Sequence, residues 1–180
     1  MFDVDAFVEE CLAANGEAEP RLAIKEVLDR AVSRPEEVAA ALPPSRAGIG
    51  RLHVTPELTI LNVVWTPGMT LWPHDHRMWA TIGIYTGGED NAFYRRDASG
   101  LATSGGRELR PADTVLLGSE TIHSVTNPTA QFAGALHIYG GEYLSTKRSI
   151  WDPETMEEGP ADGDTVRRLF ADARAREERA

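Results

Sequence analysis

Residues 58–65 read LTILNVVW, a run of β-branched, aliphatic and aromatic side chains that predicts a β-strand. Similar runs follow at 80–85, 114–117 and 132–139, and turn residues such as Gly87-Gly88 and Asn127-Pro128 separate them. Many short strands broken by glycine and proline turns are typical of an all-β sandwich or barrel. We therefore expect an all-β core, the β-barrel, over residues 49–150.

The residues on either side of this core show helical patterns instead. Apolar side chains such as Phe7 and Cys11 recur at helical spacing, and Pro20 suits the first turn of a second helix. Ser33 and Glu36 have the spacing of a capping box for a third helix. The expected organisation is one domain, residues 1–180, with a helical segment at 1–48 and a C-terminal loop and helix at 151–180.

Composition limits the classes of function. The 180-residue chain has a net charge of −10 and a pI near 4.9, which argues against nucleic-acid binding because that function needs a basic face. The only cysteine, Cys11, has no partner for an internal disulfide, so a reducing cytoplasm is the expected location. The acidic first residues do not resemble a signal peptide, and no apolar run has the length of a membrane span. We therefore expect neither a nucleic-acid nor a membrane partner.

Three histidines are candidate metal ligands. His74 and His76 form an H-x-H pair, and residues two apart on a strand point to the same face. A third imidazole, that of His123, lies in another predicted strand that a barrel can bring across to the pair. Imidazole is a common metal ligand in proteins, so the sequence predicts a site made by these three side chains.

The flanking residues resemble a known superfamily. Gly68 precedes His74, and His123 is followed by Asn127 in an H-x-x-x-N pattern. These pieces resemble the two motifs of the cupin superfamily, which implies a double-stranded β-helix, or jelly roll. The N-terminal helices and the C-terminal helix expected from the helical patterns would be added to it. The glutamate ligand that usually follows the H-x-H is absent, since residues 77–81 read RMWAT. Three neutral imidazoles leave a divalent metal ion its full double positive charge. The metal ion then attracts an anionic ligand such as a thiolate.

Within the cupins, residues 58–139 look like the cysteine dioxygenase-like, or thiol dioxygenase, family. The resemblance rests on Trp65, on the segments 73–76, 89–93 and 136–139, and on His123. It implies Fe(II), molecular oxygen and a small thiol that is oxidised to a sulfinic acid. It also implies that His137 and Tyr139 form a relay beside the iron, in which Tyr139 donates a hydrogen bond to oxygen or substrate.

The sequence departs from that family in ways that leave the identity of the thiol substrate undetermined. Ala135 replaces the serine of the relay, and no cysteine lies near Ala80 or Thr81 to cross-link with the tyrosine. Cysteine is therefore not the only substrate to consider: a thiol like 3-mercaptopropionate and a thio-imidazole such as ergothioneine are the alternatives. An aromatic or cationic substrate would suit a wall made by Trp72 and Trp79, which flank the histidine pair, although tryptophan more often fills a core.

Several other residues are candidates for the site. Three arginines, Arg51, Arg77 and Arg95, are candidates to pair with a substrate carboxylate. Alternatively, each of them is an ordinary surface residue exposed to solvent. Arg96 would face the opposite side of a strand from Arg95. Glu89 follows Gly87-Gly88 and is either part of a turn or a partner of a ligand histidine.

Other functions are compatible with the same motifs. One is a different metal-dependent cupin enzyme, such as a non-thiol dioxygenase, an isomerase or a hydrolase, because three histidines also hold zinc in hydrolytic enzymes. Another is a cupin that senses a small ligand without chemistry. We expect a monomer or a homodimer.

Overall fold

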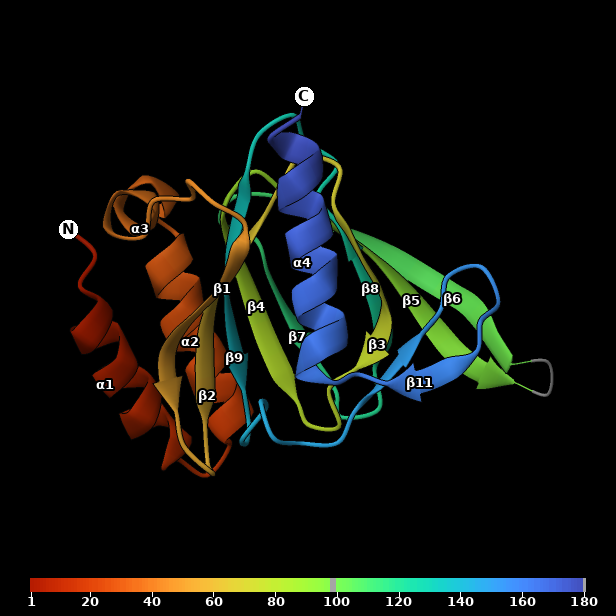
Figure 1. Ribbon diagram of the computed structural model, residues 1–180. Coiled ribbons are helices and arrows are strands. Elements are labelled where there is room, and N and C mark those ends of the chain that lie inside the picture. Colours follow the sequence, from red (N-terminus) through yellow and green to blue (C-terminus); the bar gives the residue numbers. More distant parts are fainter. Residues whose placement is uncertain (98–99, 180) are drawn as a thin grey trace.

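The computed structural model describes residues 1–97 and 100–179. Its helices are α1 (Val4–Asn15), α2 (Pro20–Val32), α3 (Pro35–Ala41) and α4 (Gly163–Glu177). Its strands are β1 (Gly48–Val54), β2 (Thr59–Trp65), β3 (Thr70–Asp75), β4 (Ala80–Thr86), β5 (Glu89–Asp97), β6 (Gly100–Leu109), β7 (Thr114–Leu117), β8 (Ile122–Thr126), β9 (Ala133–Tyr139), β10 (Ser149–Trp151) and β11 (Glu158–Pro160). In Figure 1 the helices α1 to α3 gather at one side of the strands, and α4 lies across the front of them.

Two antiparallel sheets form the β core. One has the order β1-β2-β9-β4-β7 and the other β11-β10-β3-β8-β5-β6. From β2 to β9 the chain changes sheet at every step except between β5 and β6, which pair in one sheet. Strand β2 pairs with β9 and β3 with β8, as in a double-sheet jelly roll. The predicted fold class, a double-stranded β-helix with helices added at both ends, is confirmed.

Strand β2 is buried on both faces because each of its faces packs against a separate core. Leu61, Val63 and Trp65 point into the core between the two sheets, whereas Ile60 belongs to the core under the N-terminal helices. This two-sided burial explains why residues 58–65 read as an almost continuous apolar run. Strand β9 alternates in the same way, so His137 and Tyr139 share its inner face with Ala135.

The helix α2 packs closely against β4. A Cβ added to Gly83 would lie 2.9 Å from Leu28 Cγ and 3.0 Å from Val32 Cγ1, so the glycine leaves room for the helix. Leu28 and Val32 are fully buried, whereas Leu22 on the same helix is 46% exposed. Burial of one face of α2 therefore attaches the helical segment to the barrel.

Gly68 and Asn127, the glycine and the asparagine of the two motifs, stabilise the turns at one end of the barrel. Gly68 adopts a left-handed backbone with φ of 68°, a conformation that L side chains disfavour. Its N–H donates to the Asn127 carbonyl at 3.0 Å. The buried Asn127 carboxamide donates to Thr66 O at 3.0 Å and to Gln131 O at 2.8 Å. These two residues therefore join the β2–β3 turn to the chain after β8.

Two local predictions were wrong. Ser33 does not cap α3: it ends α2, where its hydroxyl donates to Arg30 O at 2.7 Å, and Arg34 occupies the N-cap position without a side-chain cap. The loop expected before the C-terminal helix in residues 151–180 is not entirely loop, because residues 158–160 pair with β10 as β11. Among the described residues, no helix is both long and apolar enough to cross a bilayer.

Leu28→Ala is expected to lower the free energy of unfolding by about 2–5 kcal/mol, since it removes a fully buried side chain from the α2–β4 interface. Urea denaturation measures the loss. Leu22→Ala is the matched control on the exposed side of α2 and should change the stability by less than about 0.5 kcal/mol. Equal losses for the two variants would contradict the packing described here.

Candidate metal centre

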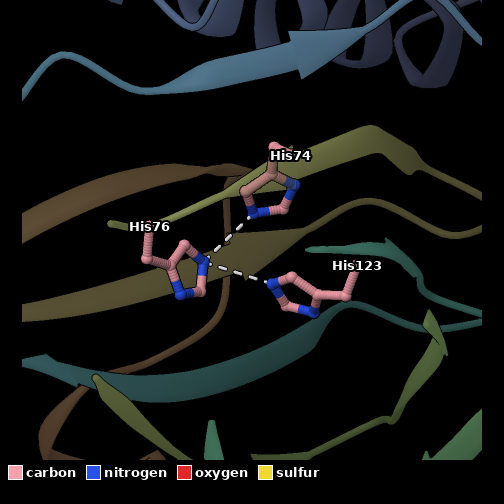
Figure 2. A group of neighbouring side chains, drawn as sticks. All are labelled: His74, His76 and His123. Carbon is pink, nitrogen blue, oxygen red and sulfur yellow. Dashed lines mark hydrogen bonds between the residues drawn. The ribbon is translucent and has the colours of Figure 1, made fainter. Parts of the chain in front are cut away.

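Three buried imidazoles meet between the sheets. His74 on β3 and His123 on β8 are direct cross-strand partners, and His76 follows the end of β3. The His76 Nε2 atom lies 3.2 Å from His74 Nε2 and 3.1 Å from His123 Nε2. Figure 2 shows the three rings turned toward one another. The structure thus brings together the three side chains that the sequence singles out as metal ligands.

The neighbours of two of these rings fix their tautomers. His74 Nδ1–H donates to the Trp72 carbonyl at 2.9 Å, because a carbonyl oxygen only accepts. His123 Nδ1–H likewise donates to the Asn91 carboxamide oxygen at 2.7 Å. Both rings therefore present an Nε2 lone pair to the centre of the group. Hydrogen bonds of this kind at Nδ1 commonly orient metal-binding histidines.

All three imidazoles are neutral near pH 7. Burial lowers the pKa of His74 from 6.5 to about 4, and burial together with the neighbouring histidines lowers the pKa of His76 and His123 well below 6.5. A neutral imidazole is the form that binds a metal, so protons do not compete for the site at neutral pH.

The group fits a divalent metal ion. The Nε2 lone pairs of His74 and His123 both point at His76 Nε2. His76 Nε2 carries at most one proton, which can bond only one of the two lone pairs, so at least one pair of nitrogen atoms repels. His76 Nδ1 is also buried without a hydrogen-bond partner among the described residues. A cation at the point where the nitrogens meet would remove this repulsion. No carboxylate belongs to the ligating group within the part of the chain that the structure describes.

A second buried chain of polar groups lies beside the histidines. Tyr139 Oη is 3.1 Å from His137 Nδ1, and His137 Nε2 is 3.3 Å from Glu89 Oε1. The Glu89 carboxylate is fully buried, and it also accepts the Trp65 indole N–H at 2.7 Å. Glu89 is therefore neither a simple turn residue nor a partner of a ligand histidine: it contacts His137. The Tyr139 ring in turn meets the His76 ring edge-on, with 5.1 Å between the centroids.

The hydrogen bonds of the relay formed by Tyr139, His137 and Glu89 have a defined direction. Because a carboxylate only accepts, His137 Nε2–H donates to Glu89 and leaves Nδ1 to accept from the Tyr139 hydroxyl. Burial and the neighbouring Tyr143 raise the pKa of Tyr139 well above 10, so its phenol stays protonated. Its proton is thus directed to His137 Nδ1, and its oxygen is left to act as an acceptor.

A small cavity of about 20 Å³ adjoins the histidines. That volume holds about one water molecule, or an ion of similar size. Its walls are mostly apolar and aromatic, and the side chains of Val166 and Phe170 from α4 form part of them. Phe170 stacks on Trp65 with 5.3 Å between the centroids, so α4 closes this side of the barrel.

The structure does not support a cavity wall made by Trp72 and Trp79, because neither lines the cavity. The Trp79 indole lies over Gly140 and packs against the core under the N-terminal helices, on the other side of the sheet. Trp72 is half-buried, and its carbonyl accepts the hydrogen bond from His74 Nδ1. The cavity receives its aromatic wall from other residues, chiefly Trp65, Tyr143 and Phe170.

The candidate arginines also lie outside the cavity. Arg77 pairs with the buried Asp75 at 2.7 Å, and Arg96 pairs with Glu158 at 2.6 Å. Arg95 is exposed toward the end of β5 and does not line the cavity. Arg51 is exposed too, but it lines a neighbouring pocket between β1 and α4.

Two functional residues were missed from the sequence. Asn91 holds His123, and its signal is its place two residues after Glu89 on one strand, so that both face inward. Tyr143 lies beyond the last predicted strand and stacks on Tyr139 with 3.9 Å between the centroids. No local pattern distinguishes Tyr143 from an ordinary loop residue.

Comparison with known proteins bears on the fold alone. No protein-family model matches the chain. Among solved structures, the chain is similar to BH2720 from Bacillus halodurans, with 14% identity and a TM-score of 0.50 over 58% of this chain and 77% of that one. It is also similar to an oxalate oxidase in complex with the substrate analogue glycolate, with 20% identity, a TM-score of 0.42 and 48% of this chain covered. The match spans only 43% of the oxalate oxidase chain.

A third similar structure is an uncharacterized conserved protein with a double-stranded β-helix domain from Klebsiella pneumoniae. Its identity is 12% and its TM-score 0.43, over 66% of this chain and 86% of that one. The jelly-roll assignment itself rests on the strand order described above.

His74→Ala is expected to abolish stoichiometric metal binding, because it removes one of three ligands. The measurement is metal content by mass spectrometry after anaerobic loading with Fe(II) and gel filtration. His53→Ala, which changes a histidine on β1 outside the group, is the matched control and should retain full metal content. If His74→Ala binds as much metal as the control, the site is elsewhere.

Proposed function

We propose that the protein is an Fe(II)-dependent thiol dioxygenase that converts a small-molecule thiol and O2 to a sulfinic acid. The observation that carries the proposal is the juxtaposition of three neutral imidazoles with the buried relay of Glu89, His137 and Tyr139. The coarser conclusion, a metal-dependent enzyme on a cupin fold, rests on the fold and the three-histidine group alone.

The ligand set favours a thiolate. Three neutral imidazoles add no negative charge, so a bound divalent ion keeps its double charge and attracts an anionic sulfur. Bound Fe(II) would supply the redox chemistry with oxygen, and the protein supplies orientation and exclusion of water. The apolar wall of the cavity and the α4 closure serve that exclusion.

The relay gives Tyr139 a proposed role as proton acceptor. The Tyr139 oxygen can accept a proton, because its own proton already bonds His137 Nδ1. A substrate S–H beside it can pass its proton to this oxygen while the phenol proton moves to His137. Glu89 then stabilises the imidazolium, as a carboxylate does in a Ser-His-Asp triad. This direction is opposite to the donor role that the family resemblance implies for Tyr139.

We expect the protein, loaded anaerobically with Fe(II) and mixed with its substrate thiol, to oxidise that thiol to a sulfinate when oxygen is admitted. Cysteine, 3-mercaptopropionate and ergothioneine form the first panel, and mass spectrometry with ¹⁸O2 should find two labelled oxygen atoms on sulfur. Uptake of oxygen with no oxidised thiol would contradict the thiol proposal and leave a metal-dependent cupin enzyme of another class.

Tyr139→Phe is expected to lower kcat/KM for that thiol by about 10²–10⁴-fold, the range for loss of a positioned acid or base. Metal content should stay unchanged, which separates this effect from loss of the site. Tyr85→Phe is the matched control, because Tyr85 is also buried but bonds Asn62 on the outer face of the sheet. Equal activity of both variants would remove Tyr139 from the mechanism.

A further inference from the structure

His76 differs from the other two histidines of the metal centre in how its ring is held. His74 and His123 each donate a hydrogen bond from Nδ1, to Trp72 O and to Asn91 Oδ1 respectively. His76 Nδ1 is buried and has no hydrogen-bond partner among the described residues. The direction of the His76 ring is therefore set by its backbone and by ring packing, and not by a hydrogen bond at Nδ1.

Ring packing gives His76 contact without a hydrogen-bond direction. The rings of Tyr139 and Tyr143 meet its ring edge-on, with 5.1 Å and 5.7 Å between the centroids. The backbone of His76 also lies outside the strand pairing, because β3 ends at Asp75, the last partner of β8. The position of His76 therefore depends on what fixes the chain immediately before and after it.

The residue before His76 is a buried aspartate. The Asp75 side chain is only 4% exposed, and it does not belong to the ligating group. Its Oδ1 accepts the Ser149 backbone N–H at 2.8 Å, and its Oδ2 lies 2.7 Å from Arg77 Nε. The carboxylate between the two histidines thus contacts the residue that follows His76 and the first residue of β10.

The residue after His76 has a strained backbone. Arg77 has a φ of 57°, in the left-handed region that a residue other than glycine adopts at a cost. Such a conformation persists only where the surroundings determine it. The ion pair with Asp75 supplies that restraint. Asp75 and Arg77 therefore form a bridge across His76, which we call the Asp75–Arg77 clamp.

Strand β10 supports this clamp beside the ligands. Ile150 is the cross-strand partner of His74, and the neighbouring Ser149 donates its backbone N–H to Asp75. The Ser149 hydroxyl donates to Glu158 on β11 at 2.5 Å. The C-terminal hairpin of β10 and β11 is thus attached to the H-x-H segment through the aspartate between the two histidines.

We infer that Asp75 and Arg77 are positioning residues that hold His76 in the metal centre. Both act through the backbone on either side of His76, and neither is a metal ligand. This inference rests on the metal binding within the proposed function, and not on its thiol chemistry. It gives Arg77 a role other than binding a substrate carboxylate.

Asp75→Ala and Arg77→Gln are each expected to raise the Kd of Co(II) by about 10–100-fold, the range for loss of a residue that orients a metal ligand. Anaerobic titration measures the Kd by the visible absorption of bound Co(II), and a changed band shape should report the altered geometry. Arg77→Lys keeps the positive charge and should retain most of the affinity. Arg77 is half-exposed, so its variants should fold even if Asp75→Ala does not.

Two controls separate positioning from other effects. Arg96→Gln removes an ion pair of 2.6 Å to Glu158 but leaves both contacts of Asp75 in place, so it should keep the wild-type Kd. Leu28→Ala lowers stability at the α2–β4 interface and should also leave the Kd of the folded protein unchanged. If Leu28→Ala raises the Kd as much as Asp75→Ala does, lost stability is the cause and the inference is wrong.

A double-mutant cycle tests whether the clamp acts through His76. Ni(II) suits this test, because it binds nitrogen ligands more tightly than Co(II) does, and calorimetry can follow its binding to two remaining histidines. Asp75→Ala should raise the Ni(II) Kd at least tenfold in the wild-type and His123→Ala backgrounds. It should have no effect in the His76→Ala background.

Three results would overturn the inference. They are a wild-type Kd in Arg77→Gln, an affinity of Arg77→Lys no better than that of Arg77→Gln, and an undiminished effect of Asp75→Ala in the His76→Ala background. If the wild-type protein binds neither Co(II) nor Ni(II), the metal site of the proposed function fails, and the inference fails with it. Metal binding that all these substitutions leave unchanged would refute the inference alone.

Discussion

The pairing of β3 with β8 is the constraint on which the site depends. It sets His74 directly opposite His123, and the chain that leaves β3 returns His76 to the same point. The hydrogen bond that His123 donates to Asn91 follows from the next pairing in the same sheet. Strand β5 lies on the other side of β8, so Asn91 can reach His123, and Glu89 precedes Asn91 by two residues on the same inward face. A shift of β8 by one residue would turn His123 away from the pair.

Much of the fold was predictable from local patterns. The run at 58–65 and the three similar runs are strands, because their β-branched and aromatic side chains fill the cores on both faces. Pro20 begins α2 as expected. The convergence of His74, His76 and His123 was predictable because the H-x-H spacing and the two motifs are local, and a jelly roll brings their strands together.

The surroundings of the ligands were not predictable in the same way. An irregularity in β3 between Leu71 and His74 breaks strict alternation, so the place of Trp72 cannot be read from its spacing to the histidines. The side of the sheet on which Trp79 lies depends on Gly140, which is distant in sequence and makes room for the indole. The pocket between β1 and α4 is lined by arginines from both elements, and only tertiary structure shows that their charges are neighbours.

The separation of the ligands along the chain has a thermodynamic consequence. His76 and His123 are 47 positions apart, and β4 to β7 lie between them. An ion held by both acts as a removable cross-link that closes this long loop, and it binds the folded chain in preference to the unfolded one. At a free metal concentration 100 times Kd, such linkage adds about 2.7 kcal/mol to the stability of the folded state. Binding of a metal ion by these histidines would therefore raise the folded population of this protein.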